Sequence, residues 1–408
     1  MDAATFAPPA QTGFDTDRLA AIDAFIKVRY LDSGKLPHAQ LLIARDGRIA
    51  HFSHQGAARE NGAAIDETSI FRIASMTKPV TSIAFMQLVE EGKVALDTPV
   101  HHVLPELKGV GVYNGGGGGV PFLTKATDEP MRMIDLLRHT SGLTYGFQNR
   151  GNIDAAYRAG KIENWHGNLD LDGFIAALGK LPLEFSPGEA WNYSVSTDVL
   201  GAVVERGAGM PLDRYFEERI FAPLGMADTG FWVPEDKIDR LTDCWTFIQG
   251  SRVMYDEGAK SAWSKRPTLV SGGGGLVSTA LDYHRFCTML LNGGTLEGAR
   301  IIGRKTLDLM TANHLPGGQD LASMSRSLFS ETQNAGTGFG LGFAVNIDVA
   351  KTMIPGSVGE FYWGGMFSTA FFVDPVERIT MVFMTQLSPS GLYPIRRELK
   401  TMIYSALT

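Results

Sequence analysis

Apolar residues recur every three to four positions in two stretches near the start of the chain. This spacing predicts amphipathic helices over residues 16–34 and 77–91, because positions so spaced share one face of a helix. Pro79 is tolerated only in the first turn of a helix, so we expect the second helix to begin close to Ser75. Gly92 is a suitable C-cap for its other end.

Strand-like patterns flank the second helix. Residues 39–44 and 48–53 predict two strands joined by a tight turn at Arg45-Asp46-Gly47. Residues 69–74, directly before Ser75, have the pattern of another strand. Later in the chain the patterns predict strands over residues 339–347, 368–374 and 378–385 and a closing helix over residues 393–407.

The middle of the chain differs from its two ends. Residues 106–270 are loop-rich, with short helix-like segments, and Gly115–Gly119 is expected to be a flexible surface loop. We therefore predict an α/β (α+β) fold. Residues 1–105 and 271–408 would form one discontinuous domain of strands and flanking helices, residues 106–270 a mostly helical insertion, and the cleft between them the active site.

The composition narrows the classes of function. Of the 408 residues, 44% are hydrophobic and 20% charged, so a sizeable core is expected. The net charge is −7 and basic residues do not cluster, so we expect neither nucleic acid nor membrane as a partner. With no secretory signal pattern and no run of 18 apolar residues, a cytoplasmic protein is expected. The oligomeric state stays open.

The sequence contains few features typical of a metal or cofactor site. Cys244 and Cys287 are the only cysteines, and neither belongs to a Cys-x-x-Cys or Cys/His cluster. Gly272–Gly275 lacks the following Lys and Ser/Thr of a phosphate loop, so we expect this segment to line the substrate pocket instead. His139 is expected to be structural. We therefore expect no metal and no cofactor.

The most informative motif is Ser75-Met76-Thr77-Lys78. A serine and a lysine three positions apart stand on the same face of a helix, which brings an amine within reach of a hydroxyl without any histidine. Such a pair suits covalent acyl transfer if the amine is neutral. The alternative is that Ser75 only caps the helix. Because no Gly-x-Ser-x-Gly elbow occurs, an α/β-hydrolase is not expected.

Two further segments favour catalysis. Tyr193 follows a turn in the insertion, where its hydroxyl could relay protons, although it could also be a packing residue. Trp363-Gly364-Gly365-Met366 precedes an apolar strand, and paired glycines allow a strand edge to approach a ligand. The N–H of Met366 could complete an oxyanion hole with the N–H of Ser75. Tyr145 could line the cleft or belong to the core.

In this order, the three segments resemble the signatures of the serine β-lactamase and penicillin-binding-protein superfamily, Ser-x-x-Lys, Ser/Tyr-x-Asn and Lys-Thr-Gly. Tyr193-Ser194-Val195 lacks the asparagine, and Trp363-Gly364-Gly365 lacks the lysine and threonine. That combination resembles the family VIII carboxylesterases, which are class C β-lactamase-like enzymes. The resemblance spans residue 15 to the C-terminus and implies an antiparallel sheet flanked by helices.

The resemblance also implies roles. Ser75 would be the nucleophile, Lys78 and Tyr193 the proton network with the base unassigned, and the N–H groups of Ser75 and Met366 the oxyanion hole. Trp363, Gly364 and Gly365 would contact substrate, and Tyr145 would join them if it lines the cleft. Losing the cationic lysine would cost an anionic antibiotic about 1.5–3 kcal/mol, which leaves room for weak β-lactam hydrolysis.

We therefore expect a serine carboxylesterase that cleaves short-chain acyl esters, with a small-molecule ester as its partner. The alternatives within enzymes are a β-lactamase, a D-amino peptidase or an acyltransferase on the same scaffold. The alternative of another class is a non-catalytic binding protein, against which the intact Ser75 and Lys78 speak.

Overall fold

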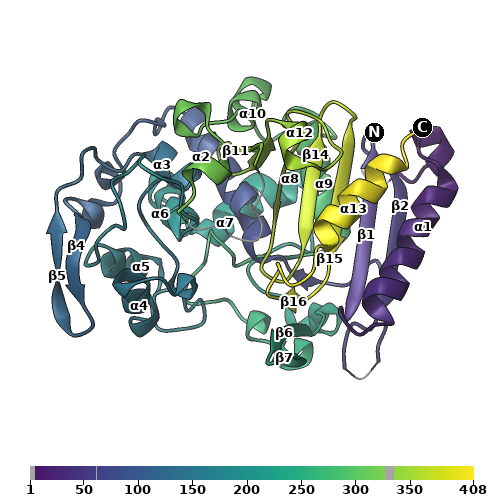
Figure 1. Ribbon diagram of the computed structural model, residues 1–408, viewed down its shortest axis with the longest axis horizontal. Helices are drawn as coiled ribbons and strands as arrows, with labels where there is room; N and C mark the ends of the chain where they lie inside the picture. The colour runs from purple at the N-terminus through teal and green to yellow at the C-terminus, as the bar shows by residue number, and fades with distance from the viewer. Residues whose placement is uncertain (1–4, 61, 327–334) are drawn as a thin grey trace.

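The computed structural model describes residues 5–60, 62–326 and 335–408 (Figure 1). Its centre is a seven-stranded antiparallel sheet with the strand order β11-β12-β13-β14-β15-β1-β2. The strands are β1 (His38–Arg45), β2 (Arg48–Gly56), β11 (Thr337–Phe339), β12 (Ala344–Asn346), β13 (Phe361–Gly364), β14 (Ala370–Asp374) and β15 (Ile379–Met384). Both ends of the chain therefore build this sheet, because β1 pairs with β15.

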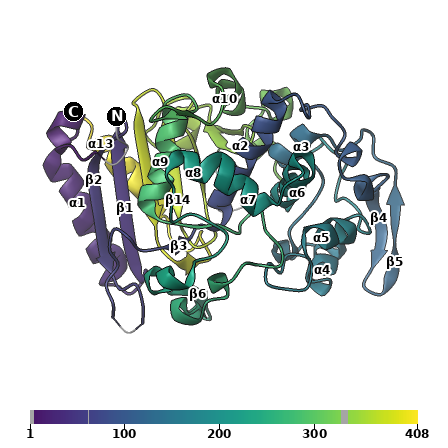
Figure 2. The same cartoon turned by 180° about the vertical axis from the view of Figure 1, so that it is seen from behind.

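Helices cover both faces of the sheet, as the two opposite views show (Figures 1 and 2). Alternate residues of a strand point to opposite faces. Leu41 and Ile43 of β1 pack with helices α1 (Thr16–Ile26) and α13 (Ile395–Ser405). Leu42 packs in a second core with helices α2 (Thr77–Glu90) and α9 (Ala280–Leu291). The α2 helix, which carries the Ser-x-x-Lys lysine, is thereby held in the interior.

The remaining helices are mostly short. They are α3 (Met133–Leu137), α4 (Asn152–Ala159), α5 (Leu171–Leu178), α6 (Ser196–Ala208), α7 (Leu212–Phe216), α8 (Ala222–Leu224), α10 (Arg304–Met310), α11 (Leu321–Met324) and α12 (Val349–Thr352). Helices α3 to α6 gather at the end of the molecule away from the sheet (Figure 1). The predicted division of the chain at residues 105 and 270 stays a prediction. Within the described residues, no helix has the length and apolar character needed to cross a membrane.

Small strand pairs lie outside the main sheet. They are β3 (Phe71–Arg72) with β8 (Val277–Ser278), β4 (Val112–Gly117) with β5 (Val120–Lys125), β9 (Thr295–Leu296) with β10 (Ala299–Arg300), and β6 (Cys244–Ile248) with β7 (Ser251–Asp256) and β16 (Leu387–Ser388). Strand β3 comes directly before the start of α2 in the chain, so its pairing with β8 fixes where α2 begins.

The prediction that Gly115–Gly119 is a loop was wrong for residues 115–117, whereas Gly118 and Gly119 form a turn. Residues 115–117 belong to β4, which pairs with β5 through two irregularities in register. Gly116 has a φ of +85°, and a Cβ there would lie 2.1 Å from the carbonyl oxygen of Pro121. The glycines therefore permit a distorted hairpin that side chains would block. This hairpin extends from the helical end of the molecule (Figure 1).

Other sequence-based bounds changed by smaller amounts. The predicted helix 16–34 is α-helical only to Ile26 and continues as a wider π-helical turn over Lys27–Leu31. The predicted strand 339–347 is split between β11 and β12, because Gly340 turns back to bond the carbonyl of Phe343 at 2.8 Å. The predicted antiparallel sheet flanked by helices is confirmed.

Candidate active site

Ser75 lies in a tight turn between β3 and α2. A 3-10 turn over Ala74–Met76 joins them, and Ala74 has a φ of +45°. This left-handed conformation is costly for a residue with a Cβ, and such strain gathers at functional sites. Ser75 is half-buried, whereas Ala74 and Met76 are buried. The turn therefore presents the serine to a cavity while its neighbours stay in the core.

Lys78 stands one turn further along α2 and is buried. Its Nζ donates hydrogen bonds of 3.2 Å to Ser75 Oγ, 3.0 Å to the hydroxyl of Tyr145 and 2.6 Å to the carbonyl oxygen of Gly273. The predicted spacing thus brings amine and hydroxyl together. A neutral amine at this position would instead accept the proton of Ser75, which is the arrangement a general base needs.

Two tyrosines flank the Lys78 amine. Its Nζ lies 4.6 Å from the centroid of the buried Tyr193 ring, and the Tyr145 and Tyr193 rings are 5.3 Å apart. Sequence reasoning expected Tyr145 either to line the cleft or to belong to the core. The hydrogen bond between its hydroxyl and Lys78 adds Tyr145 to the candidate proton network. The sequence could not predict this contact, because Tyr145 is a single tyrosine in a loop-rich segment.

Asp198, on α6, supports the position of Lys78 indirectly. Its buried carboxylate accepts a hydrogen bond of 3.0 Å from the N–H of Gly273 and another from the hydroxyl of Ser271. Burial raises the pKa of Asp198, and the nearby charge of Lys78 opposes that shift. A Cβ on Gly273 would lie 2.3 Å from the carboxylate. The glycine segment therefore holds Lys78 through a backbone carbonyl, and sequence reasoning missed Asp198.

The end of β13 approaches the turn that carries Ser75. Gly365 lies so close to it that a Cβ would be 2.4 Å from the carbonyl oxygen of Ile73. The next residue, Met366, lines the same cavity as Ser75. This proximity is compatible with a shared oxyanion hole, for which two N–H groups must point at one oxygen.

Trp363 lies behind the wall of the cavity, against Tyr193. Trp363 is 2% exposed, and its ring centroid is 5.5 Å from that of Tyr193 and 5.4 Å from that of Phe339. Among the described residues, neither Trp363, Gly364 nor Gly365 lines the cavity. Their contact with substrate stays a prediction, and Trp363 packs against the ring of a candidate catalytic residue.

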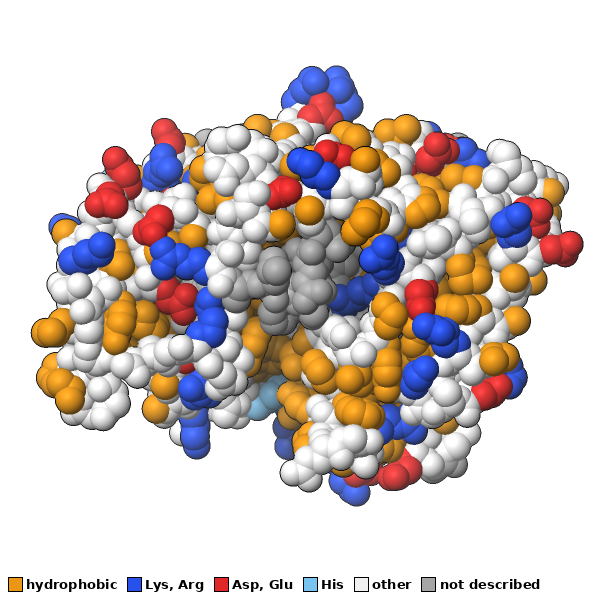
Figure 3. All heavy atoms as spheres, viewed as in Figure 1, with side chains coloured by type: hydrophobic (Ala, Val, Ile, Leu, Met, Phe, Trp, Pro, Cys, Tyr) orange, Lys and Arg blue, Asp and Glu red, His pale blue; other side chains and the backbone are white. Residues whose placement is uncertain are grey.

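The cavity beside Ser75 has a volume of about 430 Å³. Figure 3 shows the face hollowed below its centre, between the helical end and the sheet, with hydrophobic and histidine side chains at the hollow. The described residues that line the cavity are Ala74, Ser75, Tyr145, Phe147, Glu163, Asn164, Trp165, His166, Phe174, Tyr193, Val195, Asp198, Tyr255, Asp256, Ala262, Trp263, Leu269, Gly273, Gly274 and Met366. As expected, the glycine segment after Ser271 contributes to this wall.

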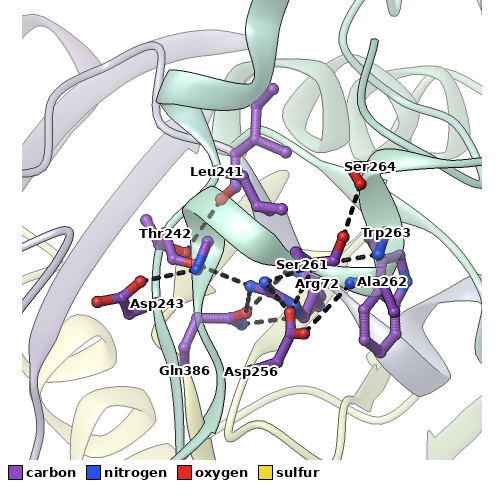
Figure 4. A network of polar contacts seen from close by, with 12 residues as sticks. Arg72, Leu241, Thr242, Asp243, Asp256, Ser261, Ala262, Trp263, Ser264 and Gln386 are labelled. Atoms are coloured by element: carbon purple, nitrogen blue, oxygen red, sulfur yellow. Dashed lines mark hydrogen bonds and ion pairs between the residues drawn. The ribbon is translucent and has the colours of Figure 1, made fainter. Parts of the chain in front are cut away.

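A buried arginine anchors the strand that leads to Ser75 (Figure 4). Arg72 donates hydrogen bonds of 2.7 Å to the carbonyl oxygen of Thr242 and 3.0 Å to Ser261 Oγ, and it forms an ion pair with Asp256. Its guanidinium also lies 5.3 Å from the centroid of the Trp263 ring. Arg72 therefore ties the turn that carries Ser75 to two residues of the cavity wall.

The buried His139 behaves as a packing residue. Its ring centroid is 5.0 Å from that of Tyr193, and its Nδ1 is 3.3 Å from Ser194 Oγ. Burial holds the pKa of His139 well below its usual range, so the ring is neutral at pH 7. No group of three or more His, Cys, Asp or Glu in the described part of the chain is arranged to hold a metal ion.

Comparison with known proteins adds a family and several relatives. A family model described as beta-lactamase matches residues 21–401. Esterase EstB from Burkholderia gladioli is 32% identical over 99% of this chain and 100% of its own, and lovastatin esterase from Penicillium rubens is 28% identical over 84% and 87%. The solved structure of EstCE1, a hydrolase with promiscuous acyltransferase activity, superimposes with a TM-score of 0.79 at 26% identity, covering 96% of this chain and 98% of that one.

Proposed function

The chain belongs to the beta-lactamase family, and from that premise we propose that it is a serine carboxylesterase whose acyl-enzyme forms on Ser75. The observation that carries the proposal is the position of Lys78, whose amine reaches Ser75 Oγ, Tyr145 and the carbonyl of Gly273 at once. Two relatives that match most of the chain are named esterases, which supports the proposal that this chain cleaves esters.

In the acylation step, Ser75 Oγ attacks the carbonyl carbon of the ester. Its proton passes to the network of Lys78, Tyr145 and Tyr193, while the N–H groups of Ser75 and Met366 hold the negative oxygen of the tetrahedral intermediate. The carbon–oxygen bond to the alcohol then breaks, and the alcohol leaves with a proton from the same network. The acyl group stays on Ser75.

In the deacylation step, water replaces the alcohol. The network takes a proton from the water as it attacks the acyl carbonyl, the bond to Ser75 Oγ breaks, and Ser75 recovers its proton. The acid product leaves. In both steps the same network first takes a proton from the attacking oxygen and then returns one to the leaving oxygen. The mechanism therefore needs no histidine.

Esters rather than β-lactams are the proposed substrates because Trp363 stands where lactam-binding relatives carry a lysine. A buried tryptophan cannot supply the charge-assisted hydrogen bond that a lactam carboxylate would accept. The acylation chemistry is shared, so slow lactam hydrolysis is compatible with the proposal.

A hydrolysis panel tests the assignment against its alternatives. p-Nitrophenyl esters of increasing acyl length, nitrocefin and a D-alanyl p-nitroanilide are compared by kcat/KM. We expect the short-chain esters to be turned over fastest, with nitrocefin slower by a factor of about ten or more. Fast nitrocefin or anilide turnover with negligible ester cleavage would favour a lactamase or a peptidase, and the absence of any turnover would favour a binding protein.

A further inference from the structure

The cavity beside Ser75 combines aromatic rings with carboxylates. Three of its described lining residues are acidic, Glu163, Asp198 and Asp256, and none is a lysine or an arginine. The aromatic members are Tyr145, Phe147, Trp165, Phe174, Tyr193, Tyr255 and Trp263. Aromatic faces attract cations through their negative quadrupole, and desolvation strengthens that attraction. A wall of this kind favours a positively charged ligand over a neutral or negative one.

Two of the three carboxylates already have partners that neutralise or hold them. Asp256 forms an ion pair with Arg72 (Figure 4). Asp198 accepts hydrogen bonds from the Gly273 N–H and the Ser271 hydroxyl, and it is attracted by the charge of Lys78. These two carboxylates hold the cavity wall in place. Because their partners already offset their negative charge, they attract a cationic ligand only weakly.

Glu163 is different. Its Oε1 accepts a hydrogen bond from the N–H of Gly146, and it forms no ion pair with any residue in the described ranges. It precedes three consecutive residues that also line the cavity, among them Trp165 and His166. Burial lowers the pKa of His166, so that ring adds no positive charge at neutral pH. The charges of Arg158 and Lys78 act on Glu163 without forming an ion pair with it among the described residues. Glu163 is therefore the carboxylate of this wall that a cationic ligand can pair with.

We propose that this cavity selects esters that carry an ammonium group, with Glu163 as its anionic partner and the surrounding aromatic rings as its packing surface. The inference rests on the proposed function, since it names the substrate class of the same site. The cation lies in the cavity while the ester carbonyl reaches Ser75 Oγ. A carboxylate-bearing substrate, by contrast, faces negative charge, which adds a second barrier to lactams besides the replaced lysine.

Matched substrate pairs that differ only in charge test the proposal. On the acyl side, p-nitrophenyl 4-(trimethylammonio)butanoate is compared with p-nitrophenyl 5,5-dimethylhexanoate. On the alcohol side, choline butanoate is compared with 3,3-dimethylbutyl butanoate. We expect kcat/KM to favour the cation by about tenfold in at least one pair. A ratio at or below one in both pairs overturns the proposal.

Variants assign the preference to Glu163. Glu163→Gln keeps an oxygen that can accept from Gly146 but removes the charge, so the cation preference should fall about tenfold, toward one. Glu205→Gln is the matched control, because Glu205 likewise accepts a backbone N–H, that of Leu212 at 2.9 Å, yet does not line the cavity. Its preference should equal that of the wild type. An unchanged preference in Glu163→Gln overturns the assignment.

A binding measurement separates this inference from the proposed function. The same substrate pairs are titrated into Ser75→Ala by calorimetry, where no turnover is needed. Tighter binding of the cationic member supports the ammonium site even if the wild type proves not to hydrolyse esters. Equal binding of both members, together with normal ester hydrolysis by the wild type, contradicts the ammonium site alone.

Discussion

The guanidinium of Arg396 donates a hydrogen bond of 2.7 Å to the carbonyl oxygen of Gly365. The same nitrogen donates another, also of 2.7 Å, to the carbonyl oxygen of Thr369. The Gly365 carbonyl belongs to the peptide whose other end is the N–H of Met366, the proposed oxyanion donor. A charge-assisted hydrogen bond to the carbonyl polarises the peptide and strengthens its N–H as a donor.

Replacing Arg396 by Met should therefore lower kcat by about tenfold, less than the loss expected when an oxyanion donor is removed outright, while KM changes little. Arg397→Met is the control, since this exposed neighbour on α13 bonds, within the described residues, only the carbonyl of Met353 at 3.3 Å. The test is to measure kcat and KM of both variants on one p-nitrophenyl ester, together with their melting temperatures. A lower melting temperature of Arg396→Met with unchanged kcat would show that Arg396 only stabilises the fold.

The two tyrosines beside Lys78 give a second prediction. Proton transfer by a positioned group contributes about 10²–10⁴-fold to the rate, so Tyr193→Phe and Tyr145→Phe should each lower kcat by a factor in that range. Tyr113→Phe, whose hydroxyl bonds the carbonyl of Gly116 far from Ser75, is the control. If Tyr145→Phe stays within a few-fold of the wild type, its hydroxyl only holds the lysine in place.

The glycine segment that holds Lys78 gives a stability prediction. Gly273→Ala would place a methyl group 2.3 Å from Asp198, and overpacking of this kind costs about 1–3 kcal/mol. The free energy of unfolding and kcat should both fall, because the carbonyl of Gly273 would shift away from the amine. Gly151→Ala has no neighbouring atom within 4 Å of its Cβ and is the control. An active, equally stable Gly273→Ala would contradict the link.

The cation preference should depend on pH. Burial raises the pKa of Glu163 to about 7, with a further increase from Asp198 and opposing effects of the Gly146 N–H, Arg158 and Lys78. The carboxyl is neutral below this pKa and anionic above it, so the cation-to-neutral ratio of kcat/KM should rise between about pH 6 and about pH 8. Ionisable groups of the enzyme that affect both substrates equally cancel in this ratio. The rise should be absent in Glu163→Gln, and a flat wild-type profile would contradict the role of Glu163.

Sequence patterns predicted those parts of the fold that depend on local periodicity. Helix α2 and strands β1 and β2 lie close to the predicted bounds, because their core faces are clear in the sequence. The prediction failed at residues 115–117 because the pairing of β4 with β5 overrides the flexibility of glycine. The resemblance to the serine β-lactamase superfamily is confirmed by the family match and by the full-length similarity to esterase EstB.

The site was predictable only where a motif marked it. Ser75 and Lys78 are three residues apart in the chain, so their contact follows from helical geometry. Tyr145 was a candidate for the cleft, but its contact with Lys78, and the positions of Glu163 and Arg396, depend on segments 67 or more residues away from Lys78 in sequence. Tertiary packing alone sets such contacts, and no local pattern of residue types announces them.

The most direct test of the account is to identify the residue that becomes acylated. The wild type and Ser75→Ala are each treated with a p-nitrophenyl alkylphosphonate and digested, and the peptides are analysed by mass spectrometry. We predict one phosphonyl group per chain, on the peptide that contains Ser75, with hydrolysis abolished in step with labelling and no label on the variant. A label on another residue, or ester hydrolysis retained by a folded Ser75→Ala, would contradict the central claim.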